Sequence, residues 1–183
     1  MNKTVNIIGL AGSLRRGSLT KILLETARDV SPESMSVTIF PLHEIPIYNN
    51  DVEVEDGFPD AVAAMRDAIK EADGLILGTP EYNGSLSGAM KNAIDWASRE
   101  GLLGKVPVVT IGGSPGALGA TKAQEHLRQI CLHLGMYVLP RPTIAVPQLP
   151  KKVEDGVLTD ETTRQFIKQQ METFYDWVVR LKD

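Results

Sequence analysis

The first segment with groups that bind anions is residues 12–20, here called the first loop. It combines small residues with hydroxyl and guanidinium groups, at Ser13, Arg15, Arg16, Gly17, Ser18 and Thr20. Together with the free N–H groups of a following helix, these are the donors that a phosphate group needs. The segment therefore indicates a phosphate site. A plain turn, with Ser18 as helix N-cap and the arginines in solvent, explains the same residues and stays open.

The second segment is the hexapeptide Pro-Glu-Tyr-Asn-Gly-Ser at residues 80–85. It follows a short apolar run at 75–77, which is typical of a buried strand, and Pro80 ends that strand because it has no N–H for the ladder. Ser85 is the expected N-cap of the next helix. Its candidate binding residues are Pro80, Glu81, Tyr82, Asn83 and Gly84. They are richer in hydrogen-bonding groups than a plain connection requires, and predict the wall of a site for a flat ligand with polar edges.

The third segment, residues 112–119, is rich in glycine and offers Ser114, Gly116 and backbone N–H groups. Such a loop can line the edge of a flat ring or hold partial negative charge. A glycine-rich connection before a helix explains it equally well.

Other chemistry is poorly supported by the sequence. The first loop lacks the Gly-Lys-Ser/Thr ending of a nucleotide-hydrolase loop and the G-x-G-x-x-G spacing of dinucleotide-binding domains. His43, His126 and His133 have no metal-like spacing, and His126 and His133 are expected to share one packed helix face. Cys131, between two apolar residues, is expected to be buried and inert. We therefore predict no catalytic side chain and no metal ligand.

Length and composition limit the class of protein. A chain of 183 residues with 43% hydrophobic and 23% charged residues predicts one globular domain, residues 1–183. A net charge of −4 gives no reason to expect nucleic acid or an anionic membrane as partner. One cysteine, no signal-like segment and no apolar run near the ~20 residues of a membrane span predict a cytoplasmic protein.

Strand and helix patterns alternate five times along the chain. Strands are predicted at 5–10, 35–40, 74–79 and 106–111, with a last strand at 137–146 that Pro140 and Pro142 interrupt. Helices are predicted at 19–30, at 59–71, after the hexapeptide, at 120–134 and from Thr159 or Asp160 onward. Longer loops are predicted at 41–57 and 147–158. This alternation favours an α/β fold, a doubly wound five-stranded parallel sheet of order 2-1-3-4-5 with helices on both faces. The loops after strands one, three and four would then meet at one place.

Four motifs carry a family resemblance: residues 12–18, 80–85, Lys-Asn-Ala-Ile-Asp-Trp at 91–96, and 114–119. With them the chain resembles the NAD(P)H-dependent FMN reductase family, flavodoxin-like in fold, and most of all its bacterial chromate and quinone reductase branch. The resemblance implies that Ser13, Arg15, Ser18 and Thr20 hold the FMN phosphate. It also implies that residues 80–83 border the isoalloxazine and that Ser114 and Gly116 line its other polar edge.

The resemblance further implies an activity. Hydride would pass from NAD(P)H to flavin N5, and electrons would then leave by a ping-pong sequence to a quinone, a flavin or a metal oxyanion such as chromate. The resemblance also implies a homodimer or homotetramer, with the third and fourth helices and the loop near residues 45–57 close to a partner's flavin. This chain departs from the family pattern at Thr20, Gly84 and Ala120, where asparagine, a larger residue and glycine are usual.

Two alternatives remain at this stage. A flavodoxin-type electron carrier has the same fold without its own nicotinamide substrate, but such carriers generally have a phosphate loop without arginine and a more acidic surface. A relative that has lost flavin and serves as an interaction protein is the other. The yellow colour of bound flavin would exclude the interaction protein, and oxidation of NAD(P)H with quinone would distinguish the enzyme from the electron carrier.

Overall fold

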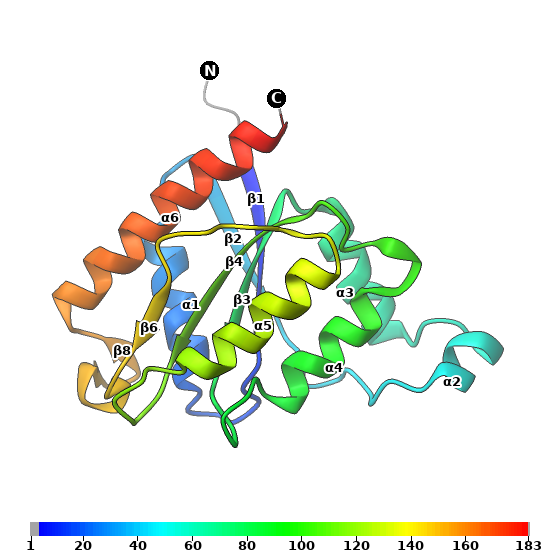
Figure 1. Cartoon of the computed structure of the whole chain (residues 1–183), viewed down its shortest axis with the longest axis horizontal. Helices are drawn as coiled ribbons and strands as arrows, with labels where there is room; N and C mark the ends of the chain where they lie inside the picture. The colour runs from blue at the N-terminus through cyan, green and yellow to red at the C-terminus, as the bar shows by residue number, and fades with distance from the viewer. Residues whose placement is uncertain (1–3, 183) are drawn as a thin grey trace.

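Six parallel strands form the central sheet of the computed structural model, which describes residues 4–182 (Figure 1). They are β1 (Val5–Ala11), β2 (Met35–Phe40), β3 (Gly74–Thr79), β4 (Pro107–Gly113), β5 (Tyr137–Val138) and β6 (Ile144–Val146). The order is β2-β1-β3-β4-β5, and β6 also pairs with β4. The predicted order 2-1-3-4-5 is confirmed, with β5 and β6 as the two halves of the interrupted last strand.

Helices cover both faces of this sheet (Figure 1). On one face lie α1 (Leu19–Val30) and α6 (Glu161–Lys182), and on the other lie α3 (Asp60–Glu71), α4 (Gly88–Ala97) and α5 (Thr121–His133). Neighbouring residues of β3 divide between the two layers: Ile76 packs under α1 and α6, whereas Leu75 and Leu77 pack under α3, α4 and α5. A strand buried on both faces is what a continuous apolar run predicts.

The C-terminal helix α6 packs through the predicted stripe. Ile167, Met171, Phe174 and Val178 are buried, and Leu181 is half-buried near the end of the helix. Asp160, rather than Thr159, caps its first turn by accepting from the Thr163 backbone N–H at 3.0 Å. No helix within residues 4–182 is long and apolar enough to cross a membrane.

Two predicted loops contain regular structure. Residues 41–57 include the short helix α2 (Asn50–Glu55), capped by Asn49, and residues 147–158 include the 3₁₀ helix η2 (Leu149–Lys152) and the hairpin β7 (Val153–Glu154) and β8 (Val157–Leu158). The loop predictions were wrong at these places because α2 buries none of its residues, so it has no apolar periodicity. Each strand of the small hairpin is only two residues long.

Arg66 on α3 fixes the end of α4. This residue is 8% exposed, and its side chain donates to the backbone oxygens of Trp96 and Arg99, at 3.0 and 3.2 Å, and to the Glu100 carboxylate at 2.6 Å. The last carbonyls of a helix have no partners within the helix, and a cation there also meets the negative end of the helix dipole. Arg66 therefore anchors α4 to α3 and to the short 3₁₀ helix η1 (Arg99–Gly101).

Candidate functional site

A cleft of about 230 Å³ opens where the loops after β1, β3 and β4 meet. The three strands end nearly level, because Ala11 pairs with Gly78 and Thr79 pairs with Gly112. The loops that follow are therefore brought together, as the order of the strands predicts. The residues that line the cleft are Ser13, Arg15, Leu19, Thr20, Pro80, Glu81, Tyr82, Gly113, Ser114 and Pro115.

The lining agrees in part with the residues predicted from the sequence. Ser13, Arg15, Thr20, Pro80, Glu81, Tyr82 and Ser114 line the cleft, whereas Arg16, Gly17, Ser18, Asn83, Gly84 and Gly116 belong to the same loops without lining it. Sequence reasoning missed Leu19, Gly113 and Pro115, which sit beside predicted residues. Only their positions next to predicted residues could have indicated them, since none of them carries a side-chain group that donates or accepts a hydrogen bond.

The first loop leaves most of its donors free of protein partners. Gly12 N–H donates to the Gly78 carbonyl at 2.8 Å and ties the loop to β3, but within residues 4–182 the N–H groups of residues 13–18 have no protein acceptor. Ser13 and Thr20 are 7% and 2% exposed, and their hydroxyls have no partner among the described residues, yet neither hydroxyl is sealed from the surface. Donors that reach a cleft in this way suit an anion.

Both interpretations of Ser18 have support. Its side chain caps α1 by accepting from the Lys21 N–H at 3.1 Å, as the plain-turn interpretation predicts. The same cap starts a helix whose N-terminus faces the cleft through Leu19 and Thr20. Gly78 allows this close approach: a Cβ there would collide with Leu24 and lie 2.9 Å from the Thr20 methyl carbon.

The hexapeptide forms a tight hairpin, defined here as residues 80–87. Tyr82 and Ser85 pair as an antiparallel bridge and exchange two backbone hydrogen bonds, at 3.0 and 3.1 Å. Asn83 and Gly84 between them have φ of 53° and 72°, the left-handed geometry of a type I′ turn, for which Asn-Gly is a preferred sequence. Gly84 is thus a turn requirement of this chain.

Ser85 is not the N-cap of α4, so that prediction was wrong. Ser87 is the N-cap, accepting from the Met90 N–H at 3.2 Å, and it also donates to the Gly12 carbonyl at 2.5 Å. Because the turn and its closing bridge extend to Ser85, the N-cap of α4 lies two positions later than predicted. Ser87, which is 1% exposed, joins the hairpin to the first loop, and sequence reasoning missed it.

Two further contacts join the hairpin to α5. Glu81 accepts from the Ala123 N–H in the first turn of α5 at 3.3 Å, and Ser85 Oγ lies 2.9 Å from His126 Nδ1. A carboxylate at a helix N-terminus is favourable because the free N–H groups there carry partial positive charge. Of the two roles open for Glu81, ligand contact and helix contact, the second is observed.

The loop after β4 is held by its neighbours while its tip stays free. Ser114 N–H donates to Val146 and Ser114 accepts from Leu149, at 3.1 and 3.0 Å, and Gly116 accepts from Gln148 at 3.0 Å. Within the part of the chain that the structure describes, the N–H groups of residues 116–119 have no protein acceptor. The start of this loop lines the cleft through Gly113, Ser114 and Pro115, and its tip carries free backbone donors.

Other candidate groups lie outside the cleft. Burial raises the pKa of the Cys131 thiol to about 12, so this buried cysteine stays protonated and unreactive, as predicted. His126 and His133 are exposed, so the expected packed face was wrong. Among the described residues no group of three or more His, Cys, Asp or Glu side chains is arranged to hold a metal ion.

Comparison with known proteins assigns the family. The sequence model of the NADPH-dependent FMN reductases matches residues 5–151. The chain belongs to this family. An NAD(P)H-dependent FMN reductase of Pseudomonas aeruginosa is 39% identical over the whole of both chains, and a quinone reductase of Escherichia coli K12 is 37% identical over the same full coverage.

A solved structure agrees with this assignment to the FMN reductases. FerB of Paracoccus denitrificans, described as a flavoenzyme NAD(P)H:(acceptor) oxidoreductase, is 32% identical, with a TM-score of 0.87 over 97% of this chain and 98% of its own. The predicted family and flavodoxin-like fold are confirmed. So are the predictions of an oxidoreductase, with FMN as cofactor and NAD(P)H as reductant, of the FMN reductase and quinone reductase type.

Proposed function

We propose that the chain transfers electrons from NAD(P)H to quinones, free flavin or chromate-like oxyanions, with FMN bound in the cleft between the three loops. One observation carries this proposal: a loop with unpaired hydrogen-bond donors and a polar hairpin held by the fold line the same cleft. The two parts of a mononucleotide, a phosphate and a flat ring, match these two segments.

The first loop would hold the phosphate. The Ser13 and Thr20 hydroxyls, the Arg15 guanidinium group and the N–H groups of residues 13–18 would donate to its oxygens. Arg16 and Gly17 lie beside them in the same loop, and Ser18 starts the helix whose N-terminus faces the anion. Thr20, where the family usually has asparagine, keeps a hydroxyl donor at this position.

The hairpin and the loop after β4 would hold the ring. Pro80, Glu81 and Tyr82 line one side of the cleft, with Asn83 and Gly84 at the turn; Ser114 with Gly116 would bond the polar edge opposite. Bound FMN supplies the chemistry, accepting hydride from the nicotinamide and passing electrons to a second substrate. The residues of this chain bind and orient, and no side chain is required as acid or base.

The acceptors are proposed from the relatives and from the openness of the site. Relatives are named for quinone and for 2-hydroxy-1,4-benzoquinone reduction. Tyr82 is 50% exposed and Leu118 is 60% exposed at the ends of the two ring-side loops, which leaves room for flat acceptors of several shapes. With one open face, the ring would receive reductant and acceptor in turn, which is a ping-pong order.

The assembly and location are part of the proposal. Ile47 and Val54, 82% and 73% exposed, lie on the arm around α2 that projects from the body of the fold (Figure 1). Apolar side chains this exposed favour a homodimer or homotetramer in which a second copy covers the arm. A single cysteine supports a reducing, cytoplasmic location.

The test is anaerobic reduction of the FMN-loaded protein. We expect a yellow protein that NADH or NADPH bleaches, and that quinone, FMN or chromate reoxidises, with parallel double-reciprocal plots. A protein that takes up no FMN overturns the proposal. A protein that binds FMN, but that neither nicotinamide reduces, is the electron carrier instead.

A further inference from the structure

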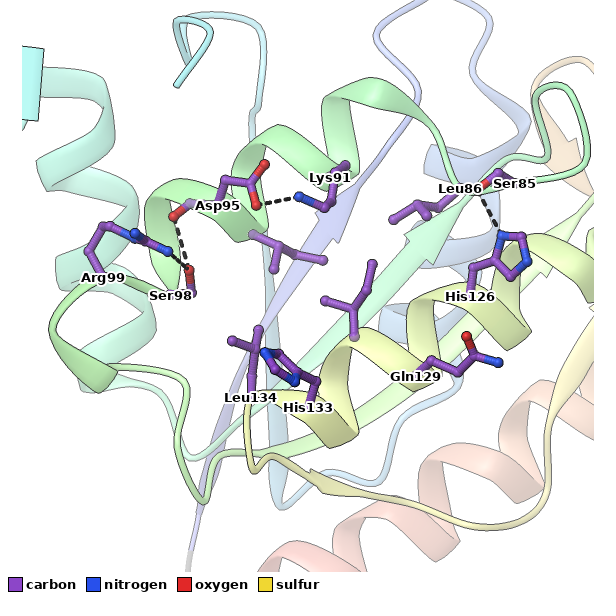
Figure 2. Close-up of a pocket in the computed structure, with 12 residues that line it drawn as sticks. Ser85, Leu86, Lys91, Asp95, Ser98, Arg99, His126, Gln129, His133 and Leu134 are labelled. Carbon is purple, nitrogen blue, oxygen red and sulfur yellow. Dashed lines mark hydrogen bonds and ion pairs between the residues drawn. The ribbon is translucent and has the colours of Figure 1, made fainter. Parts of the chain in front are cut away.

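A groove of about 570 Å³ runs between α4 and α5, beside the hairpin (Figure 2). At one end of it the Ser85 hydroxyl meets His126, which lies on the exposed side of α5. His133 lines the same groove seven residues further along α5. Figure 2 shows the dashed contact from Ser85 to His126, and His133 at the other end of the helix.

The backbone positions of Ser85 and Tyr82 are coupled through the hairpin. The two residues exchange both backbone hydrogen bonds across a turn of only two residues, so they move as one unit. Tyr82 lines the cleft at 50% exposure, with no side-chain hydrogen bond among the described residues. Its place beside a bound ring is therefore set by the backbone of the hairpin.

The chain ties this backbone at few points. At one end of the hairpin, Ser87 is hydrogen-bonded to the Gly12 carbonyl, and at the other end Glu81 is hydrogen-bonded to α5. Between these two contacts, the Ser85 side chain is hydrogen-bonded to His126 of α5. Without that contact the upper part of the hairpin would be free to tilt away from α5.

We propose that His126 is a positioning residue, which through Ser85 holds the hairpin and Tyr82 in the geometry that receives the flavin ring. The inference deepens the proposed function and rests on it for the flavin readout. The hairpin itself can be followed without flavin.

The variant His126→Ala removes the contact, and His133→Ala is the matched control, because His133 is exposed on the same side of α5 without a hydrogen-bond partner among the described residues. His126→Asn is the conservative variant, since its side-chain amide can either donate to or accept from the Ser85 hydroxyl. Ser85→Ala removes the other partner.

The first measurement is hydrogen exchange of the Tyr82 and Ser85 amides in the apo-protein. We expect His126→Ala to raise both rates about five-fold, as for loss of one neutral hydrogen bond, with His133→Ala at the wild-type rates. His126→Asn should restore protection. Adding His126→Ala to Ser85→Ala should change nothing more, because the two variants remove one contact.

The second measurement is FMN affinity and the reduction potential of the bound flavin. We expect the dissociation constant to rise by about two- to five-fold in His126→Ala and the potential to shift, with recovery in His126→Asn.

Equal exchange rates in His126→Ala and His133→Ala overturn the inference, and so does a double variant whose effects add. Failure of the wild type to bind FMN counts against the proposed function alone, because the exchange data still decide the role of His126.

Discussion

The hairpin and the first loop line the same cleft, but they use their polar groups in opposite ways. In the hairpin, Glu81, Ser85 and Ser87 all bond to other parts of the protein. In the first loop, the hydroxyls of Ser13 and Thr20 and the backbone N–H groups of residues 13–18 have no protein partner within residues 4–182. One region is fixed by the fold, and the other leaves its donors available to a ligand.

The difference indicates how the two ends of a mononucleotide would be recognised. A flat ring makes few strong hydrogen bonds, so its wall must be held in place beforehand by the protein. A phosphate makes many charge-assisted bonds and can order the groups that bind it. Changes in the hairpin should therefore affect stability, and changes in the first loop should affect FMN affinity.

The largest effect on stability is expected at Ser87. Ser87→Ala removes the cap of α4 and leaves the buried Gly12 carbonyl without its donor, so the free energy of unfolding should fall by about 2–3 kcal/mol. Ser18→Ala is the matched control, because Ser18 caps α1 without such a second contact, and it should lower stability by about 1 kcal/mol. Urea unfolding measures both, and equal losses would show that the contact to Gly12 contributes nothing.

Arg15 tests the other side of the comparison. Arg15→Ala should weaken FMN binding by about ten-fold, as for loss of one exposed charge-assisted bond, and leave apo-protein stability within about 0.5 kcal/mol. Arg16→Ala should weaken binding less, because Arg16 does not line the cleft. Titration of FMN fluorescence measures the affinities. A destabilised apo-protein, or a greater loss of affinity at Arg16, contradicts this division of roles.

Gly84 tests the turn of the hairpin. Its φ is 72°, and a Cβ there would meet only Lys122 Cδ at 3.9 Å, so Gly84→Ala adds backbone strain without collision and should lower stability by about 1 kcal/mol. Gly88→Ala, in the first turn of α4 with nothing within 4 Å and no positive φ, should leave stability unchanged or slightly raised. Thermal or urea unfolding of the pair decides, and a neutral Gly84→Ala would mean that the turn relaxes.

The smallest effect is expected at Ala120. This residue has φ of 68° and is fully buried, so in Ala120→Gly the relief of about 1 kcal/mol of strain opposes the loss of about 0.8 kcal/mol from one buried methyl. The net change in urea unfolding should stay within about 0.5 kcal/mol. A loss above 1.5 kcal/mol would show that packing against Gly112 dominates at this departure from the family pattern.

Sequence reasoning went furthest where a pattern repeats over many residues. The strand order, the stripe of α6 and the convergence of three loops follow from apolar periodicity and from the alternation of strand and helix. It was wrong where structure is short or where polar groups choose partners distant in sequence. Helix α2, the cap at Ser87 and the exposed sides of His126 and His133 are examples.

The sequence by itself determined the sheet, its layers and the motifs that assign the chain to the FMN reductases. Those properties depend on burial and on local turn chemistry, which residue types encode directly. Only the tertiary structure decided which polar groups are used and which are free. Ser87 meets Gly12 75 residues away along the chain, and Ser85 meets His126 41 residues away. Such pairs form because packing of the helices on the sheet brings them within reach. The local sequence around one partner does not predict the other.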